Sequence, residues 1–521
     1  MKSQDVRLQR SILSIGDPNL RLISAERVLS ANLATFAAGR PLLGLFLMLM
    51  SIRVASAATV TLTPGDDIKA AINSHPSGTT FSLKAGVYRM QSLVPKTGDK
   101  FIGQTGADLN GSQVVTNWAK RGAYWISSGD PELSKPFKSA GGMSWCQDTS
   151  TGCMYSQDLY LNDGPLVHRL SLPITSGQWY FDYTNDVVYM VDNPTGQKVE
   201  LSISHHAFSG NANNVTVQGL IIEKYAVSLL GGAIQPSGSG WIVQNNEVRL
   251  NHGEGIKTYG SNEQVLSNNV HTNGEEGIST GRSTGDLFEF NQMSNNNFAK
   301  ISYVTESGGG KFSGTSNARV INNTVSNNDG AGIWFDALSS GGIIKGNTVT
   351  NNTRDGIRYE NSHSGTISNN VLKNNAQKNG ICSSTSTANY REIIVIGSDY
   401  TSVTANTITS NCAGIFLSGC QPTQSTPIIT VDDVVTDNTT TYSGSTVIPN
   451  RIGAQDGKQC VGHPLLNPAN NNYFDYNSYH FKSTSMLNLQ NWVWGVFGSS
   501  TNFKTWSQWR AAGQDIHGTA D

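Results

Sequence analysis

The sequence predicts an all-β fold, a parallel β-solenoid with about two dozen residues in each turn. A phrase in which isoleucine follows glycine, or once lysine, recurs at 254–256, 276–278, 299–301, 331–333, 355–357, 379–381 and 413–415. A second phrase, in which valine or isoleucine follows asparagine, keeps step with the first, for example at 268–270 and 346–349. Between these phrases apolar and polar residues alternate, which is the period of a strand. Such short strands bury their apolar faces only by stacking on the next turn.

The composition excludes several classes of protein. The 521 residues include 36 Lys and Arg against 38 Asp and Glu, a net charge of −2, and only 14% of them are charged. A chain this close to neutrality has no polybasic surface, so we expect no nucleic-acid partner. The 54 glycines and the asparagine-rich middle of the chain also argue against a helical bundle or a coiled coil.

The recurring asparagines are predicted to be structural. Asparagine accepts the left-handed backbone that a tight corner requires. Asparagines stacked at the same corner of successive turns can also hydrogen-bond from one coil to the next. We therefore assign them to the corners of the solenoid and not to a binding site.

The N-terminal segment resembles a secretory signal. Residues 41–50 read PLLGLFLMLM, after a stretch that contains Arg21, Arg27 and Arg40 and before the small residues 54–58. The ten apolar residues are short of the roughly 20 that a spanning helix requires, which argues against the alternative of a membrane anchor. We expect cleavage after Ala57 and a secreted, extracellular or periplasmic product with no membrane contact.

Six cysteines, at positions 146, 153, 382, 412, 420 and 460, follow the predicted cleavage point. Cys146 and Cys153 could close a small loop, and the last four could staple loops near the C-terminal end. Their even number suits an oxidising compartment. We expect the mature chain to be a monomer.

Two segments outside the repeats carry a family resemblance. Together with the repeats, residues 65–89 (GDDIKAAINSHPSGTTFSLKAGVYR) resemble the secreted right-handed parallel β-helix proteins of the pectate-lyase-like superfamily, and residues 476–518 resemble the closing segment of carbohydrate-directed members. The resemblance implies a right-handed single-stranded parallel β-helix with an N-terminal capping helix, in which Ile68, Ala71 and Ile72 share an apolar face after Asp66 and Asp67.

The resemblance also implies a carbohydrate-directed activity of the lyase, hydrolase or epimerase group. The D-P-H-D string of mannuronan epimerases and the N-T-D, D-D and R-I-K series of polygalacturonases are absent from the sequence. A complete calcium and arginine set of pectate lyases is absent as well. The reaction therefore has to be argued from the residues of this chain.

Rhythm and resemblance together divide the chain into five parts. These are a signal peptide (1–57), an N-terminal cap with the first coils (58–117), a β-rich insertion (118–205), the β-helix repeats (206–440) and the C-terminal coils with a cap (441–521).

Alternation places the residues one and three positions after each recurring isoleucine on the outer face. The outward pairs are Lys257/Tyr259, Ser279/Gly281, Ser302/Val304, Trp334/Asp336 and Arg358/Glu360. Coils stack about 4.8 Å apart. We therefore predict that Trp334 lies over Arg358 and that Asp336 lies over Glu360.

This face predicts a glycan site. Trp334 offers a flat surface to sugar rings, and Arg358 suits a uronate carboxylate. Paired carboxylates could act as acid and base or hold Ca²⁺, and Glu306 is a further possible calcium ligand beside Asp336 and Glu360. The alternative is a purely structural role, in which Asp336, Arg358 and Glu360 form a surface salt bridge with Trp334 under the guanidinium.

A second observation points to the same face. The interval from Ile301 to Ile333 is 32 residues, longer than its neighbours, and its extra residues include the glycine-rich segment 305–311, which we expect to be a loop. Loops anchored on a rigid scaffold collect binding residues, so Glu306 and Lys311 become candidates. His363 is expected at the same rim as an acid or base.

The leading functional hypothesis is a secreted enzyme that acts on a uronate-containing polysaccharide by β-elimination or hydrolysis. The rival is a non-catalytic surface or matrix protein that binds glycan. The predicted catalytic residues are Asp336, Glu360, Lys311, His363 and Arg358. The predicted substrate-binding residues are Trp334, Lys257, Tyr259, Arg282 and Glu306.

Overall fold

The computed structural model describes residues 59–128, 142–302, 306–378, 381–382, 391–410, 413–419, 428–443, 452–457, 460–497, 499 and 502–521. The predicted signal peptide lies outside these ranges, as do Cys412 and Cys420. Within them, no helix has both the length and the apolar character that a membrane crossing requires.

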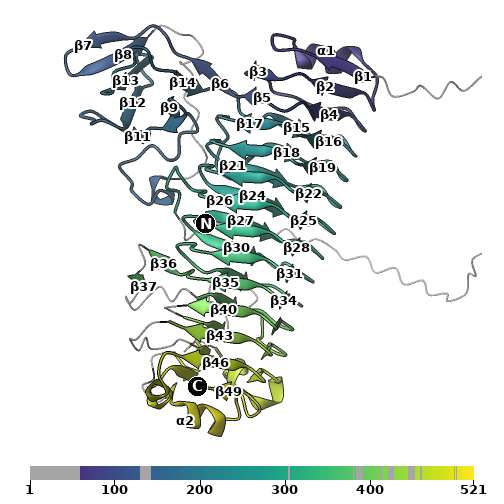
Figure 1. The fold of residues 1–521 in the computed structure, drawn as a ribbon, viewed down its shortest axis with the longest axis vertical. Coiled ribbons are helices and arrows are strands. Elements are labelled where there is room, and N and C mark those ends of the chain that lie inside the picture. The colour runs from purple at the N-terminus through teal and green to yellow at the C-terminus, as the bar shows by residue number, and fades with distance from the viewer. Residues whose placement is uncertain are drawn as a thin grey trace, which may run out of the picture. The chain divides into compact units, whose positions relative to one another are not determined.

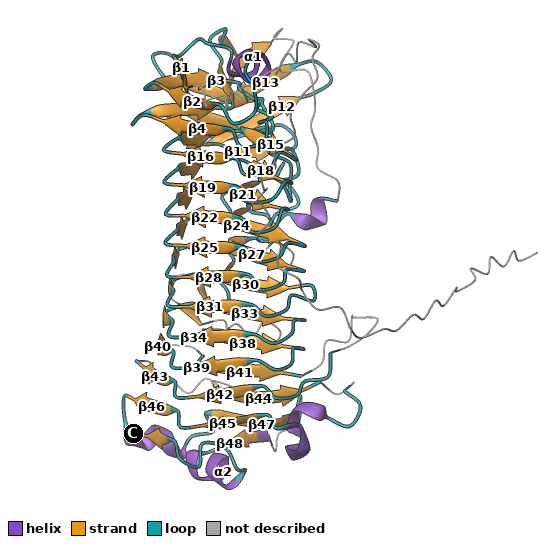
Figure 2. Cartoon of the chain, turned by 90° about the vertical axis from the view of Figure 1, so that its right-hand side faces the viewer, coloured by secondary structure: helices purple, strands orange, loops and turns teal. Residues whose placement is uncertain are grey.

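Three long sheets wind around one core (Figures 1 and 2). Their strands are parallel, apart from the last pair of sheet C. Sheet A comprises β1 (Thr59–Leu62), β2 (Thr80–Leu83), β4 (Lys100–Gly103), β16 (Thr216–Gln218), β19 (Ile242–Gln244), β22 (Gln264–Leu266), β25 (Leu287–Glu289), β28 (Arg319–Ile321), β31 (Ile343–Lys345), β34 (Thr366–Ser368), β39 (Ser402–Thr404), β42 (Val434–Thr436) and β45 (Tyr473–Asp475). Sheet B comprises β3 (Gly86–Arg89), β5 (Ala107–Asn110), β17 (Ile221–Glu223), β20 (Glu247–Arg249), β23 (Asn269–His271), β26 (Gln292–Ser294), β29 (Thr324–Ser326), β32 (Thr348–Thr350), β35 (Val371–Lys373), β40 (Thr407–Ser410), β43 (Thr439–Tyr442), β46 (Ser478–Phe481) and β49 (Thr519–Ala520). Sheet C comprises β15 (Phe208–Gly210), β18 (Gly232–Pro236), β21 (Glu254–Thr258), β24 (Glu276–Gly281), β27 (Gly308–Ser313), β30 (Ala331–Asp336), β33 (Ile357–Glu360), β38 (Ile393–Ile396), β41 (Ile415–Ser418), β44 (Ile452–Asp456), β47 (Trp492–Val496) and β48 (Phe503–Lys504).

Each turn adds one strand to each sheet, so inward side chains stack in columns. In sheet C, Ile256 pairs with Ile278, and Ile333 pairs with Ile357. All four are fully buried in the core, as the recurring phrase predicted. The fold is therefore the predicted all-β parallel β-helix.

Buried asparagines form two ladders along the corners. In the first, Asn246, Asn268, Asn291, Asn323, Asn347, Asn370, Asn406, Asn438 and Asn477 each donate from Nδ2 to the Oδ1 of the next member, and the last donates to Asp515. In the second, Asn251, Asn273, Asn296, Asn328, Asn352 and Asn375 do the same, and the last donates to Glu392. The predicted structural role of asparagine is confirmed.

The helices are short. α1 (Ile68–Ser74) begins after Asp67, whose side chain accepts from the Ala70 N–H, and it buries Ile68 and Ile72 in the core. That it caps the open end of the β-helix stays a prediction. α2 (Trp506–Ala511) lies near the C-terminus, and the 3₁₀ helices are η1 (Met143–Trp145), η2 (Pro464–Leu466), η3 (Pro468–Asn470) and η4 (Thr484–Asn488).

The insertion forms two small sheets, one of which also includes β6 (Ser112–Val114), a strand that precedes the predicted boundary at residue 118. That sheet has the strand order β10 (Gly164–Pro165), β9 (Leu159–Leu161), β14 (Val199–Ser202) and β6. The other has the order β11 (Val167–Arg169), β12 (Gln178–Asp182), β13 (Val187–Met190), β8 (Tyr124–Ser128) and β7 (Ala119–Arg121). A separate short hairpin joins β36 (Gln377–Lys378) and β37 (Ile381–Cys382). Trp179, Phe181 and Leu201 belong to the insertion's own apolar core.

The predicted Cys146–Cys153 disulfide is present, with the two Cα atoms 5.8 Å apart. Cys460 is also disulfide-bonded. Disulfides persist in oxidising compartments, which agrees with the compartment predicted from the cysteine count.

The predicted register is wrong at two of the recurring phrases. At 379–381, Ile381 belongs to the β36–β37 hairpin, and Ile393 pairs with Ile357 in sheet C instead. Ile301 does not belong to sheet C but pairs with Cys146 of the insertion, so Ser302 is not on the outward face of the sheet. The glycine-rich segment is not a loop either, because residues 308–313 form strand β27. Gly310 occupies the isoleucine column, between Ile278 and Ile333.

Packing explains why Gly310, and not Ile301, occupies the isoleucine column. A Cβ on Gly310 would lie 2.6 Å from the carbonyl oxygen of Ile278 and 3.3 Å from the Phe312 ring. The Phe312 ring fills the core instead, stacked 5.1 Å from Phe335. As a consequence Lys311 points outward, in register with Ser279 and Trp334.

Candidate functional site

A cleft of about 630 Å³ lies on the outer face of sheet C, over β21, β24, β27 and β30. Its lining includes six of the ten predicted site residues, namely Lys257, Tyr259, Arg282, Glu306, Lys311 and Asp336. Trp334, Arg358 and Glu360 belong to β30 and β33, whereas His363 lies elsewhere. The stacking of coils therefore brings together residues that are up to 79 positions apart in the sequence.

Lys311 joins two carboxylates within the cleft. Its Nζ lies 2.9 Å from Oε1 of Glu306 and 3.3 Å from Oδ2 of Asp336. Because both oxygens bind one nitrogen, these oxygens can be no more than about 6 Å apart. Burial alone lowers the pKa of Lys311, but Glu306 and Asp336 together raise it above its ordinary value, so the ammonium keeps its charge.

Glu306 has a pKa above its ordinary value. Burial raises its pKa, and this effect outweighs the lowering by Lys311. Glu276 lines the same cleft and is buried. Its burial raises its pKa well above the usual range, and the charges of Glu254 and Glu306 raise it further. In the described part of the chain, Oε2 of Glu276 has no hydrogen-bond partner. Carboxyl groups of this kind can donate protons near neutral pH.

Lys257, which also lines the cleft, forms a second lysine–glutamate ion pair. Lys257 Nζ contacts Oε1 of Glu254 at 2.7 Å, and Ser279 donates a short hydrogen bond to the other oxygen of that carboxylate. Burial alone lowers the pKa of Lys257, but Glu254 and Tyr259 raise it above its ordinary value. Burial also raises the pKa of Tyr259. Both groups therefore hold their protons, which makes them poor bases.

Glu254 and Glu276 were not identified from the sequence as residues of the site. Glu254 and Glu276 are the first residues of the E-G-I phrases at 254–256 and 276–278, which we interpreted only as repeat markers. Both are 1% exposed. Buried glutamates in a repeat need a partner or a proton, and a recurring acidic residue directly before Gly-Ile was a signal that could have identified them.

Trp334 is not the exposed platform that the sequence predicted, although it does pair with Arg358 as expected. It is 6% exposed, because Lys311 Nζ lies 3.7 Å from its ring centroid and the Arg358 guanidinium carbon 5.1 Å. Two cations therefore cover the indole. A sugar ring could reach its face only by displacing them.

The pairing of Phe335 with Tyr359 keeps the predicted register of Asp336 over Glu360, but Arg358 of its own strand neutralises Glu360. Both of its carboxylate oxygens accept from Arg358, at 2.7 Å and 2.9 Å. The same guanidinium also contacts Asp355 at 3.1 Å. A bidentate pair of this kind is a strong structural ion pair. It corresponds to the alternative of a structural salt bridge, with Asp355 in the place of Asp336.

His363 does not line the cleft. It forms a bridge in the turn between β33 and β34, and its Nδ1 lies 2.8 Å from Oδ1 of Asp399. It was predicted at the same rim as the glycine-rich segment, and it is not among the residues that line the cleft.

Arg282 offers a positive charge to a ligand. It lines the cleft and is exposed. Among the residues that the structure describes, it makes no ion pair. An unneutralised guanidinium at the rim of a cleft suits an anionic group such as a uronate carboxylate.

The residues present do not fit the predicted calcium site. Glu306 and Asp336 converge on the Lys311 ammonium and Glu360 on Arg358, so cations of the chain itself stand where the metal would be held. In the described part of the chain, no group of three or more His, Cys, Asp or Glu side chains is placed to hold a metal ion.

Comparisons with known proteins agree with this fold. The family model "Right handed beta helix region" matches residues 231–392. A structure described as "The complex structure of XylC with xylose" is 14% identical, with a TM-score of 0.61, and the alignment covers 79% of this chain and 80% of that one. A "Glycoside hydrolase" structure is 8% identical over 69% of this chain and 96% of that one, with a TM-score of 0.47.

The A-module of the Azotobacter vinelandii mannuronan C-5 epimerase AlgE4 is 13% identical over 79% of this chain and 88% of that one, with a TM-score of 0.43. No curated protein matches the sequence. The family model and the first of the three structures show the right-handed parallel β-helix fold that was predicted from the pectate-lyase-like resemblance.

Proposed function

With a right-handed parallel β-helix as its scaffold, we propose that this chain is an exported carbohydrate-active enzyme that hydrolyses a uronate-containing glycan in the sheet C cleft. The observation that carries the proposal is the Lys311-bridged pair of Glu306 and Asp336. Two carboxyl groups about 5 Å apart are the equipment of a retaining glycosidase. The upper limit on their separation favours this geometry over the wider spacing of inverting enzymes.

Each residue has a defined role in the reaction. Glu306 donates its proton to the glycosidic oxygen as the bond to the anomeric carbon breaks, while Asp336 attacks that carbon and forms an ester. Water then adds to the anomeric carbon, gives its proton to the Glu306 carboxylate and releases Asp336. Lys311 orients the two carboxyl groups, and Arg282 binds the carboxylate of a neighbouring uronate.

Hydrolysis is favoured over β-elimination by the protonation of the candidate bases. An eliminating enzyme needs a group that removes the C5 proton. Lys257 and Tyr259 both have raised pKa values and hold their protons. His363 lies outside the cleft. The carboxyl pair has no such obstacle as the acid and the nucleophile of a hydrolase.

Export is part of the same proposal. The predicted signal peptide and the Cys146–Cys153 disulfide support it. An extracellular polysaccharide is the substrate that such a location makes available.

The experiment incubates the purified chain with polygalacturonate, alginate, glucuronoxylan and a neutral glucan, and it measures new reducing ends and ultraviolet-absorbing unsaturated ends separately. We expect reducing ends without unsaturated ends, from an acidic polymer, and at least about a 1000-fold loss in Glu306→Gln and in Asp336→Asn. Glu289→Gln is the matched control, because Glu289 lies on sheet A and, in the part of the chain that the structure describes, its carboxylate accepts only from Asn322.

Three results would overturn the proposal. Unsaturated ends would mean elimination. Binding of polymer without any new ends, unchanged in the two variants, would mean a non-catalytic glycan-binding protein. Reducing ends from the neutral glucan alone would remove the role of Arg282.

A further inference from the structure

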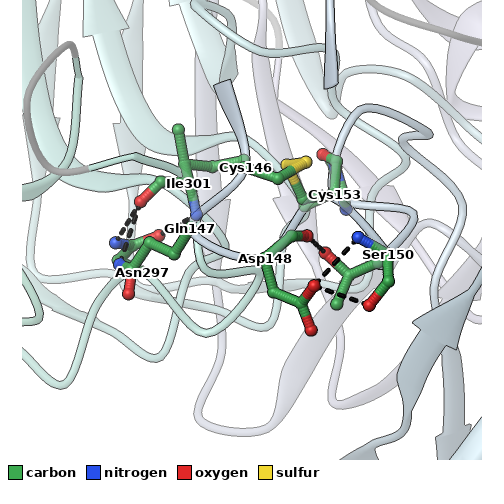
Figure 3. Close-up of a disulfide and its surroundings, with 9 residues drawn as sticks. Cys146, Gln147, Asp148, Ser150, Cys153, Asn297 and Ile301 are labelled. Carbon is green, nitrogen blue, oxygen red and sulfur yellow. Dashed lines mark hydrogen bonds between the residues drawn. A yellow bond between two sulfur atoms is a disulfide. The ribbon is translucent and has the colours of Figure 1, made fainter. Parts of the chain in front are cut away.

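The loop Cys146–Cys153 of the insertion contacts the segment that carries Glu306 into the cleft. The loop is closed by the disulfide between its ends. Figure 3 shows Gln147 of this loop beside Asn297 and Ile301 of the β-helix. The inference drawn from these contacts rests on the proposed function, because it concerns the position of its acid.

The main chains of the two segments are joined like neighbouring strands. The N–H of Gln147 donates to the Lys300 carbonyl at 2.8 Å, and the N–H of Ser302 donates to the Trp145 carbonyl at 2.6 Å. Cys146 and Ile301 form the antiparallel bridge between these two bonds. This backbone pairing fixes the direction and the register of residues 300–302.

The Gln147 side chain adds a second connection. Its Nε2 donates to the Ile301 carbonyl and to Oδ2 of Asp329, each at 3.1 Å. Asn297 contacts the same two residues, donating to the carbonyls of Ile301 and Asp329 at 2.9 Å and 2.8 Å. The loop, the segment and the next coil are therefore held in one hydrogen-bonded network.

Apolar burial reinforces the polar network. Ile301 is fully buried, and it packs in a cluster with Cys146, Cys153, Met154 and Leu229. This isoleucine is not in the core column of sheet C, where Gly310 pairs with Ile278 instead. Its burial therefore depends on the insertion.

Glu306 is hydrogen-bonded to this anchored segment. The Glu306 N–H donates to the Ser302 carbonyl at 3.3 Å, and the Glu306 carboxylate reaches Lys311 at 2.9 Å. Ser307 donates from Oγ to the Asp329 carbonyl, the residue that Gln147 also holds. The acid thus lies between two attachments, of which the first belongs to the insertion.

We propose that the disulfide-closed loop Cys146–Cys153 is a positioning element for Glu306, and that Gln147 is its principal positioning residue. Gln147 touches neither the substrate nor the reacting atoms. It acts by holding residues 300–302, so that Glu306 meets Lys311 beside Asp336. The insertion is then a working part of the site, and reduction of the disulfide lowers turnover.

The test uses the full chain and the substrate found in the panel above. Gln147→Met keeps the length of the side chain and the backbone donor but removes the amide. We expect kcat to fall at least about tenfold with KM within about twofold, because a displacement of about 1 Å at a reacting group can cost on the order of 100-fold. The pH at which activity falls should also shift, since the Lys311 contact lowers the pKa of Glu306.

Two further variants and one structural readout complete the test. Ser150→Ala is the matched control, because among the described residues the Ser150 side chain bonds only to Asp148 within the loop. The double variant Cys146→Ser with Cys153→Ser, and the wild type treated with reductant, should behave like Gln147→Met. Hydrogen exchange at the amides of Ser302 and Glu306 should speed up at least about tenfold in Gln147→Met and remain slow in Ser150→Ala.

The outcomes separate this inference from the proposed function. If the wild type has no turnover, the proposed function fails, and the exchange experiment still tests the positioning. If the wild type is active and Gln147→Met keeps its kcat, its pH profile and its slow exchange, the positioning role is wrong. Equal losses in Ser150→Ala and Gln147→Met would likewise reduce the effect to general loosening of the loop.

Discussion

Lys311 lies over the indole of Trp334, its Nζ 3.7 Å from the ring centroid, and reaches Asp336 and Glu306 from that position. The indole of Trp334 is therefore covered by the ammonium that joins the two carboxylates. On the opposite side, Arg358 covers the same ring. One buried aromatic ring therefore contacts both cations of the site, Lys311 and Arg358.

Replacing Trp334 by alanine should destabilise the fold before it affects glycan binding. Loss of a buried tryptophan leaves a cavity and costs about 3–5 kcal/mol. Trp334→Phe should lose less than half of that. The measurement is the urea-induced unfolding of both variants, with polymer binding followed in parallel. A variant of unchanged stability that no longer binds polymer would restore Trp334 as a sugar platform.

Replacing Lys311 by methionine should move the pH profile of hydrolysis upward. The proposed reaction needs protonated Glu306, so activity falls as pH rises through the pKa of that group. Burial raises this pKa and Lys311 lowers it, so removal of the cation raises it further. The dependence of kcat/KM on pH is the measurement, with Lys345→Met on sheet A as the control. A basic limb that stays in place would remove the coupling between the two residues.

The contact of the insertion through His252 should weaken as pH rises. The His252 Nδ1 lies 3.0 Å from Asp158 Oδ2, and its Nε2 lies 2.9 Å from the Cys153 carbonyl oxygen. Both partners only accept, so both ring nitrogens donate and the imidazole is charged. Burial alone lowers the pKa of His252, but Asp158 raises it above the ordinary value.

The sign of the effect follows from linkage. A raised folded pKa gives stability that is fully present below the unfolded value of about 6.5 and is lost as pH rises through the folded value. His168 beside it stays neutral, because burial and then the His252 charge lower its pKa to about 3. We expect the free energy of unfolding of the wild type to exceed that of His252→Gln at pH 5 and the difference to shrink by pH 9. A constant difference would mean that the charge is irrelevant.

A break in the first asparagine ladder should be costly. Asn323 Oδ1 accepts from the N–H and the Nδ2 of Asn291, and its own Nδ2 donates to Asn347. In Asn323→Ala these buried groups lose their partners, which costs about 2–3 kcal/mol. Thr324→Ala, at an exposed neighbouring position of β29, should cost less than about 0.5 kcal/mol. Thermal and urea unfolding compare the two, and similar losses would contradict a structural role for the ladder.

Removal of divalent metal should leave hydrolysis unchanged. The ammonium of Lys311 stands between Glu306 and Asp336, where a bound cation would be repelled. We expect a chelator, and calcium added after it, to alter the initial rate by less than about twofold. Recovery of a lost rate by calcium alone would bring the predicted metal site back.

Much of the fold could be predicted from local chemistry. The Gly-Ile phrases placed Ile256, Ile278, Ile333 and Ile357 in the core column, and simple alternation placed Trp334 against Arg358. The asparagine corners were identified for the same reason: Asn322 has the left-handed backbone, and its neighbour Asn323 bonds along the axis. These features depend only on the period of a strand and on the spacing of coils, which neighbouring residues determine.

The candidate site depended on one coil whose register local chemistry could not choose. Both Ile301 and Gly310 can follow Ile278 in the column, and the apolar pattern favours the isoleucine. Gly310 takes the position because Ile301 is buried under Cys146 of an insertion some 150 residues earlier and because Phe312 fills the space.

The amino-acid sequence by itself therefore determined the coiled β-helix, its asparagine corners and six of the residues that line the cleft. Only the tertiary structure decided that Lys311 joins Asp336 to Glu306, while Arg358 binds Glu360 in its own coil. Strand period is a property of consecutive residues, whereas the pairing of charges depends on which distant segment covers each side chain.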